Sequence, residues 1–577
     1  MAIQLFTFEK GINKRKENPI RLDEDELQSC SGLQFGKEGM LECRPTRTAV
    51  NPTPLGSIHN IHRYMNWVLV GDDYNVRYKW DLNGYCNQYT PADDEFTSVG
   101  SLSSDRRLSL TDYWKFTFLV NGRDKKAFTH GNLYEWGIAN PSGAPAGTKG
   151  DENESYVAAG TYSLYYTFQV MFPNGHIAET GPSPAGSVTL DAAAEIDWTG
   201  IQPSNYSGTG CRIWRNLYRT VSGTTYFVDS IKNNTDTTYT DIKSAITTNA
   251  LLGTSTYEGP PDGFVDVEWY LQRVFGIKGE KIYWSEPYLP FAFATASNLA
   301  ASSKGDDLVA VANWGDQLFM PTQTTWYRLV GSDATTWEIK RSFTDMGIIN
   351  RHTMQKTKYG ILGFWYEGIC LFDGSTSINI TEKQLGKSFF EDIVTSESGI
   401  LSSPCHAHFD GTKYYFYYPE DGESTLTQCL VLDFAMYPSI KMYHDDFIAT
   451  AHEYHRPTGI RYLGKSNGYQ YEEAGEDETI STSLQTGDSV FTDIIHQKNP
   501  MYLYYDLDSD GKDVTVTIYV DGSSAQTITL NVDEREKKRM KLLQKDGYRI
   551  GLGISCSDSQ GLKIYSPWAI DATPFGD

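Results

Sequence analysis

The stretch with the clearest metal-ligand spacing is "DLDSDGKDV", in which three carboxylates precede a glycine. Asp506, Asp508 and Asp510 alternate in the order that calcium loops use to gather oxygen ligands around one ion. The twelfth position of such a loop is Thr517, where a helix–loop–helix calcium site needs a bidentate glutamate, and strands are expected on both sides. We therefore favour a charged hairpin over a calcium site, and we expect no other cofactor.

Two histidine-rich stretches, "CHAH" and "HEYH", could in principle hold a transition metal. Zinc proteases need histidines at i and i+4 on a helix, whereas His452 and His455 are three residues apart in a strand-like context and face opposite sides. His406 and His408 share a face of a strand, but two ligands do not make a site. We interpret these residues as surface or core histidines and predict no metal site.

Motifs for enzymatic catalysis are missing from the sequence. There is no Walker loop, no GxSxG and no GxGxxG after a strand. The stretch "GSDATTW" comes nearest to the Asp-box of propeller hydrolases but lacks its glycine. The 73 acidic residues single out no carboxylate pair of the kind that glycosidases use. The sequence therefore predicts a protein that is not an enzyme and has no catalytic residues.

Charge and hydropathy limit the kinds of partner. The net charge of -23 disfavours a broad DNA-gripping surface, because such surfaces need Lys and Arg to displace counterions from phosphates. No apolar run is long enough for a secretory leader or a membrane span. Eight cysteines without a CxxC pair favour reduced thiols. We expect a soluble protein that is made in the cytosol.

The elements that must position these residues are expected to be β-hairpins. Eleven Asp-Gly or Asn-Gly pairs punctuate short apolar or alternating runs, which is the strongest short-range signal for hairpins. Four regions share a loose pattern, in which one strand is followed within a few residues by an aromatic strand that ends at a turn. Examples are "NVRYKWDLNG", "GNLYEWG", "TTWYRLVGSD" and "GICLFDGST". The spacing suggests units of about 40–50 residues, the size of propeller blades. An irregular pair of β-sandwiches is the alternative. We predict an all-β protein built on a split β-propeller.

Composition changes divide the chain into five segments. A Gly- and Pro-rich loop "ANPSGAPAGTKGDENES", the stretch "EGPPDG" and the acidic "YQYEEAGEDETIST" mark the boundaries. The segment after the first boundary resembles a fibronectin type III module. The predicted segments are an N-terminal arm with entry strands (1–50), the first part of the propeller (51–150), an inserted fibronectin III-like β-sandwich (151–262), the second part of the propeller (263–475) and a C-terminal β-sandwich (476–577).

Two basic segments are candidates for contacts with other subunits. "DEREKKRMKLLQKDG" is the only strongly helical-looking stretch, and a solvated helix face is an equally good reading of it. The other lies in the N-terminal arm. The candidate interface residues are Lys14, Arg15, Lys16, Lys537, Lys538 and Arg539.

The N-terminal segment also carries a family resemblance. The pattern "GIN…NP…L…E…C.GLQF…G.LE.RP", together with "FTDMGIINRHTM…GILGFWYEGICLFDG" (343–374), resembles the propeller-containing tail nozzle proteins of short-tailed bacteriophages, also called tail tubular protein B. In looser form the likeness extends over most of the chain. The residues that carry its first part are Gly11, Ile12, Asn13, Pro19, Leu22, Glu26, Gly32, Gly39, Leu41, Arg44 and Pro45.

The resemblance implies a structural virion protein in the phage tail. Such a protein is expected to form a homo-oligomeric ring, a hexamer, below the portal and its adaptor, and to retain and then conduct DNA during ejection. Adaptor (head–tail connector) proteins, tail fibres or spikes, and transiently the DNA would be its partners. A strongly acidic subunit suits a conduit along which phosphates slide without adhering.

Two other functions stay open from the sequence. One is a carbohydrate-binding or carbohydrate-cleaving propeller, in which aromatic side chains such as those of "KYYFYY" stack on sugars. The other is an intracellular propeller scaffold that binds peptides. A test of ring formation would separate the nozzle hypothesis from both.

Overall fold

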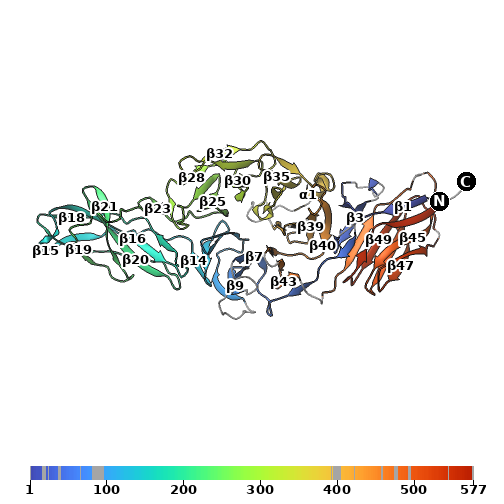
Figure 1. Cartoon of the computed structure of the whole chain (residues 1–577), viewed down its shortest axis with the longest axis horizontal. Helices are drawn as coiled ribbons and strands as arrows, with labels where there is room; N and C mark the ends of the chain where they lie inside the picture. Colours follow the sequence, from blue (N-terminus) through green and yellow to red (C-terminus); the bar gives the residue numbers. More distant parts are fainter. Residues whose placement is uncertain are drawn as a thin grey trace.

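A computed structural model gives the fold of the chain. It is all-β, as predicted, and three bodies lie in a row in Figure 1: an inserted sandwich, a ring of β-sheets and a C-terminal sandwich. The described residues are 2–15, 21–23, 25–36, 40–64, 67–80, 96–303, 305–391, 393, 404–420, 423–456, 459–473, 478–491, 495–543 and 545–574.

The middle body is a β-propeller, with seven four-stranded antiparallel blades in the described part of the chain. The innermost strands, in blade order, are β7 (Ile58–Tyr64), β11 (Ser109–Tyr113), β24 (Asp266–Tyr270), β29 (Ala312–Trp314), β33 (Gln355–Lys356), β37 (His406–Phe409) and β41 (Ala451–His455). The second strands are β8 (Trp67–Asp72), β12 (Phe116–Val120), β25 (Arg273–Lys278), β30 (Gln317–Pro321), β34 (Ile361–Trp365), β38 (Lys413–Tyr418) and β42 (Ile460–Gly464). The third strands are β9 (Asn75–Trp80), β13 (Lys125–Thr129), β26 (Lys281–Trp284), β31 (Trp326–Val330), β35 (Gly368–Phe372), β39 (Gln428–Asp433) and β43 (Gln470–Glu473). The outermost strands are β10 (Thr97–Ser101), β14 (Asn132–Glu135), β28 (Asn298–Ala300), β32 (Glu338–Arg341), β36 (Ser377–Asn379), β40 (Lys441–Asp445) and β6 (Arg47–Ala49).

The sequence of the middle strands explains why the blades stack. β8 (WVLVGD), β12 (FTFLV) and β35 (GICLF) are buried along their whole length. A strand that is covered on both faces needs a continuous apolar run rather than an alternating one. These runs therefore form the layers between adjacent blades.

The ring is closed by a strand from the start of the chain. β6 pairs antiparallel with β43, so that Ala49 lies opposite Tyr471 in the seventh blade. The first blade then begins at β7, and the sixth and seventh blades come from the end of the propeller sequence. The closure joins residues that are more than four hundred positions apart in sequence.

The inserted sandwich leaves the ring between the second and third blades. Its first sheet has the order β15-β19-β22 and its second the order β17-β16-β20-β21, with β18 also paired to β16. An additional two-stranded ribbon, β23 with β27, lies at its base. The bounds are β15 (Ala146–Val157), β16 (Gly160–Met171), β17 (Ile177–Glu179), β18 (Gly186–Leu190), β19 (Ala194–Thr199), β20 (Arg212–Val221), β21 (Thr224–Ile231), β22 (Tyr239–Asp241), β23 (Tyr257–Glu258) and β27 (Phe293–Ala294).

An aromatic cluster fixes the inserted sandwich to the propeller. Phe172 of the sandwich stacks on Phe291 of the third blade at 4.7 Å between ring centroids, and it contacts Phe116 of the second blade edge-on at 5.2 Å. These rings belong to one continuous buried cluster that includes Trp136 and Trp198. Packed aromatic pairs of this kind are worth about 0.5–1.5 kcal/mol each beyond their area burial.

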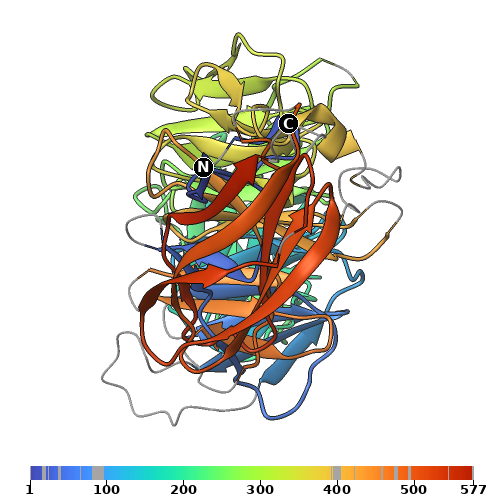
Figure 2. The same cartoon turned by 90° about the vertical axis from the view of Figure 1, so that its right-hand side faces the viewer.

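The C-terminal sandwich uses strands from both ends of the chain, and both termini lie at this end of the molecule (Figure 1). Figure 2 views the molecule from this end, with the sandwich in front of the propeller. One sheet has the order β1-β51-β45-β50-β5-β4, with β48 paired to β45. Its strands are β1 (Ala2–Phe6), β4 (Leu33–Phe35), β5 (Leu41–Cys43), β45 (Lys498–Asp508), β48 (Glu536–Lys541), β50 (Lys563–Ile564) and β51 (Trp568–Pro574).

The second sheet of this sandwich continues directly into the propeller. Ten strands follow in the order β37-β38-β39-β40-β2-β3-β44-β49-β46-β47, so the sixth blade and the sandwich share one hydrogen-bonded ladder. Gly11 allows the crossing, because its φ of 78° is positive and a Cβ there would meet the carbonyl oxygen of Met442 at 2.4 Å. The new strands are β2 (Gly11–Ile12), β3 (Glu26–Ser31), β44 (Thr482–Thr486), β46 (Asp513–Val520), β47 (Ser523–Asn531) and β49 (Ile550–Cys556).

The N-terminal segment, predicted to hold an arm and entry strands, supplies β1 to β5, which pair with other strands of this chain. One sequence prediction is wrong at this point. The basic segment predicted as a helix contains the strand β48, which pairs residue by residue with β45 from Tyr502↔Lys541 to Leu507↔Glu536. Hydrogen bonds to a long neighbouring strand outweigh the small helix preference of Lys, Arg and Glu, which amounts to a few tenths of a kcal/mol per residue.

Helical structure is minor. The helices that lie entirely within the described residues are α1 (Gly386–Glu391) and a 3-10 turn at Arg351–Thr353. No helix in these parts of the chain has the length and apolar character needed to cross a membrane. Seven of the eight cysteines lie in the described residues, and all seven are free thiols.

Candidate functional sites: a basic edge strand, an ion-pair seam and the propeller channel

The basic strand β48 lies at an edge of its sheet. Among the described strands it pairs with β45 alone, and Lys537, Lys538, Arg539 and Lys541 are all exposed. The guanidinium of Arg539 lies 4.4 Å from the ring centroid of Tyr502, and the Nζ of Lys538 donates to Glu536 at 2.9 Å. The predicted residues Lys537, Lys538 and Arg539 therefore make β48 an exposed cationic edge strand, with Lys537 and Arg539 on one face of the sheet and Lys538 on the other.

The N-terminal basic residues are used within the chain. The backbone N–H groups of Lys14 and Arg15 donate to the Gln384 carbonyl at 2.7 and 2.9 Å, and Nη1 of Arg15 donates to the Glu382 carbonyl at 3.1 Å. Both side chains remain exposed. Lys16 lies outside the described residues. Lys14 and Arg15 thus fasten the segment after β2 to the loop before α1.

The three aspartates of the candidate calcium loop do not form a cation site. Asp506 is buried and accepts two hydrogen bonds from Arg535, at 2.8 and 2.7 Å. Asp508 lies 3.9 Å from the Nζ of Lys563, and Asp510 sits in the turn with a positive φ of 49°. Across the described part of the chain, no group of three or more His, Cys, Asp or Glu is arranged to hold a metal ion. Asp506 instead stabilises the start of the β48 segment.

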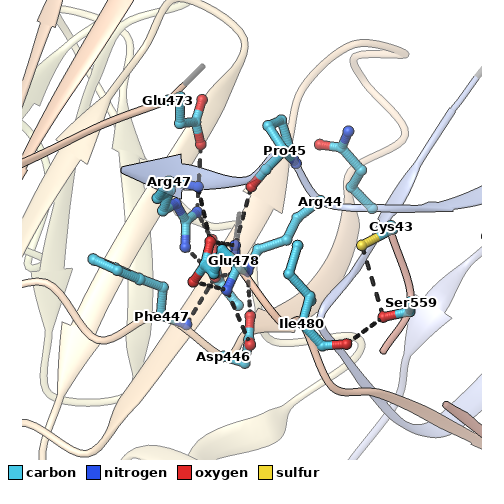
Figure 3. Close-up of polar contacts among 12 residues, drawn as sticks. Cys43, Arg44, Pro45, Arg47, Asp446, Phe447, Glu473, Glu478, Ile480 and Ser559 are labelled. Carbon is cyan, nitrogen blue, oxygen red and sulfur yellow. Dashed lines mark hydrogen bonds and ion pairs between the residues drawn. The ribbon is translucent and has the colours of Figure 1, made fainter. Parts of the chain in front are cut away.

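An ion-pair cluster joins the start of the chain to the end of the propeller (Figure 3). Arg47 donates from Nη1 and Nη2 to the two carboxylate oxygens of Asp445 at 3.0 and 2.6 Å. Arg44 donates to Glu478 from both Nη atoms at 2.8 and 2.9 Å, and its other edge contacts Asp446. We call these residues, together with Glu473 beside Arg47, the Arg44–Arg47 seam.

The arginines of the seam are buried, and their charges keep Asp445 ionised. Arg44 and Arg47 expose 6% and 4% of their surface, and the Arg47 guanidinium lies 4.5 Å from the ring centroid of Phe447. Burial alone would raise the pKa of Asp445, but the charge and hydrogen bonds of Arg47 hold it well below its ordinary value. Bidentate arginine–carboxylate pairs of this geometry fix orientation as well as charge. The "RPTR" stretch thus locks β6 into the seventh blade.

The propeller encloses an axial channel with a volume of about 370 Å³. Residues from the innermost strand, or its immediate flank, line it in all seven blades: β7, β11, β24, β29, β33, β37 and β41. The lining residues are far apart in the sequence, and closure of the ring brings them together. Titratable side chains occupy much of this lining.

Two arginines meet at one end of the channel. Arg107 precedes β11 and Arg351 precedes β33, and Nη2 of Arg351 donates to the Arg107 carbonyl at 3.1 Å. Nη2 of Arg107 lies 3.3 Å from Nδ1 of His406, and its Nη1 donates to the His59 carbonyl. Burial, and then the neighbouring cation, lower the pKa of Arg107 to about 9; burial is also the main cause that lowers the pKa of Arg351 to about 10.

The two histidine stretches come together in this channel. The rings of His408 and His452 stack at 4.2 Å, and His406 stacks on Tyr417 at 4.6 Å. His452 accepts from Arg461 at Nε2 (3.2 Å), and its Nδ1 lies 3.1 Å from the Tyr417 hydroxyl. Burial lowers the pKa of His408 to about 3 and that of His406 and His452 well below 6.5, so these imidazoles are neutral at pH 7.

Carboxylates lie on the channel wall and next to it. Although burial opposes it, the Asp112 carboxylate, 2.9 Å from Nε2 of His62, raises the pKa of that histidine to about 9. Burial raises the pKa of nearby Glu453 to about 7. On the third blade, Glu268 pairs with the Nζ of Lys356 at 2.7 Å. Sequence reasoning missed this channel, because no local spacing relates seven separate strands.

Comparisons with known proteins do not assign this chain to a family. No family model and no curated protein matches the chain. A chain of a crystal structure of the mitotic checkpoint complex aligns with a TM-score of 0.29 and 7% identity, covering 75% of this chain and 95% of that one. The Pan2 WD40 domain of Neurospora crassa gives 0.23 and 9%, covering 75% and 97%. The extracellular domain of a putative one-component system of B. thetaiotaomicron gives 0.25 and 9%, covering 95% and 86%. These scores are too low for an argument from likeness.

Proposed function

We propose that this chain is a non-enzymatic structural subunit of a bacteriophage tail, and that several copies assemble side by side into a nozzle-like ring. The sequence resemblance at residues 11–45 and 343–374 supports this function. The first of these segments builds the strands that join the sandwich to the propeller, and the second runs through the fifth blade.

The observation that carries the proposal is the basic edge strand β48. It is a cationic edge strand on a chain whose net charge is -23, so its charge is complementary to that of another copy of this chain. Leu543, two residues beyond β48, exposes 71% of its surface and supplies an apolar contact next to the charges. Rings need such heterologous contacts, in which two different patches meet.

The proposed conduit for DNA is the space enclosed by the ring of subunits. The propeller's own channel is unsuited to that role, because it holds about 370 Å³ and the hydrogen bonds of Arg107 and Arg351 cross its end. An acidic subunit repels the phosphate backbone, which lets DNA slide without adhering.

The aromatic stretch that suggested carbohydrate binding is buried. The aromatic residues of "KYYFYY" form β38, and Tyr414 to Tyr418 each expose 5% of their surface or less. They pack inside the sixth blade and between it and its neighbours, where no sugar ring could stack on them.

The mass of the purified protein by light scattering, alone and mixed with tail-less phage particles, tests the proposal. We expect a ring in at least one of the two conditions, and we expect K537E/K538E to abolish it. The matched control is K340E/R341E, which reverses two exposed basic residues on another outermost strand, β32. A protein that stays monomeric with the particles, or rings that form equally well in both variants, would contradict it.

A further inference from the structure

The cationic end of the propeller channel contains hydrogen-bond donors that have no acceptor. Nε and Nη1 of Arg351, which together carry three N–H groups, have no partner, and neither does Nε2 of His352 or of His406. Arg351 exposes 4% of its surface and His406 exposes 3%. Buried polar groups in native proteins are nearly always satisfied, so a set of unpaired donors at one place points to a missing acceptor.

The two arginines also lack a counter-ion. In the described part of the chain neither Arg107 nor Arg351 forms an ion pair, although other buried arginines such as Arg47 and Arg219 do. Asp266 is near Arg351, but its carboxylate accepts instead from Ser109 and from the backbone N–H groups of Val267 and Val311. Two adjacent guanidinium groups, one buried and one partly buried, are costly to the folded state without an anion.

We propose that Arg107, Arg351, His352 and His406 bind a small oxyanion in the propeller channel. The ligand is a phosphate-like ion or a carboxylate, free in solution or at the end of a larger molecule. The channel volume of about 370 Å³ is in the range of ordinary small-molecule pockets. The anion accepts the unpaired N–H groups and neutralises the arginine pair. This inference is independent of the tail proposal.

The surrounding groups agree with an anion rather than a cation. Burial lowers the pKa of both imidazoles well below 6.5; the charges of Arg351 and Arg107 add to this effect at His352, and that of Arg107 adds to it at His406. Two carboxylates in or beside the wall, by contrast, already have cationic partners: Asp112 has His62 and Glu268 has Lys356. The electrostatic potential at this end of the channel is therefore positive within an acidic protein.

Thermal unfolding and calorimetric titration of the full chain test the site, with sodium phosphate added against sodium chloride at equal ionic strength. For a Kd of about 0.1 mM, 10 mM phosphate shifts the folding equilibrium roughly 100-fold. We expect the melting temperature of the wild type to rise by about 2 °C or more, with one phosphate bound per chain. R351M and R107M should lose the rise, while R341Q, which changes an exposed arginine, should retain it.

Parallel titrations with sulfate and acetate identify the ligand class. A response to phosphate and sulfate alone assigns a tetrahedral oxyanion, and a response to acetate as well assigns a carboxylate. Stability in anion-free buffer separates binding from a structural role. R351M should then be at least as stable as the wild type, because an unpaired buried charge is removed. No response of the wild type to any of the three anions, or an equal response in R351M and R107M, would overturn the proposal.

Discussion

Replacing Arg47 by methionine tests the Arg44–Arg47 seam directly. The change removes two charged hydrogen bonds to Asp445, at 3.0 and 2.6 Å, and the contact with the Phe447 ring, while it keeps most of the side-chain volume. Hydrogen bonds to charged groups contribute about 1.5–3 kcal/mol each, and breaking one side of a buried pair costs about 3–5 kcal/mol. We therefore expect R47M to lower the free energy of unfolding of the propeller by about 3–5 kcal/mol.

Denaturant unfolding at pH 7, followed by the fluorescence of the propeller tryptophans, measures this loss. In R47M/D445N no buried charge is left without a partner, so the double variant should be more stable than R47M. R341M is the matched control, since its partner Asp345 is 3.7 Å away and both side chains are exposed; it should cost less than about 0.5 kcal/mol. A loss below about 1 kcal/mol in R47M, or strictly additive effects of R47M and D445N, would refute the reasoning.

The stability that the Arg47–Asp445 pair contributes should decrease at acid pH. Arg47 holds the pKa of Asp445 below the unfolded value of about 3.9, so the pair's stability is complete above that pH. It is lost as the pH falls from about 4 toward the folded pKa. In R47M, burial without the arginine should instead raise the pKa of Asp445. The stability difference between wild type and R47M should therefore shrink as the pH falls below 4.

Two further substitutions probe the β-ladder and the channel. G11A should be destabilised by about 2 kcal/mol or more in thermal unfolding, because its Cβ would meet the Met442 carbonyl oxygen at 2.4 Å. G522A, at a similar positive φ with open space around it, should cost about 1 kcal/mol, and equal losses would show that crowding is irrelevant. D112N should return the pKa of His62 from about 9 toward 6.5, as followed by proton NMR. The stabilisation from this pair is complete below pH 6.5 and is lost as the pH rises through about 9, so an unchanged His62 titration would contradict the assignment.

Local sequence patterns were sufficient to predict the class of fold. Apolar runs that end at Asp-Gly or Asn-Gly pairs predict the hairpins, as at "GICLFDGST", which forms β35 and the turn that leads to β36. The sequence pattern gave a wrong prediction at β48. Its Lys and Glu residues suggest a helix, but the segment instead forms backbone hydrogen bonds with the long strand β45. Intrinsic preference decides only where tertiary pairing does not.

The candidate sites were harder to predict because they depend on closure of the ring. Arg107, Arg351 and His406 come from three blades, and only the propeller geometry places them at one end of the channel. Their positions in the blades could have indicated the site, because each of the three residues lies at or just before an innermost strand. The partner of Asp506 was equally hard to predict, because Arg535 lies almost thirty residues later and has no place in a local motif.

The pairing of β1 with β51 has a consequence for how the chain is made. The first strands leave the ribosome roughly 500 residues before their partners, and at about 5–20 residues per second that interval is on the order of 25–100 s. During that time β1 to β5 lack the neighbours that bury Phe6, Phe8 and Leu27 in the finished protein. Nascent chains should therefore be vulnerable to proteases and to aggregation until β51 has been made, and a truncated chain that lacks β51 should be insoluble.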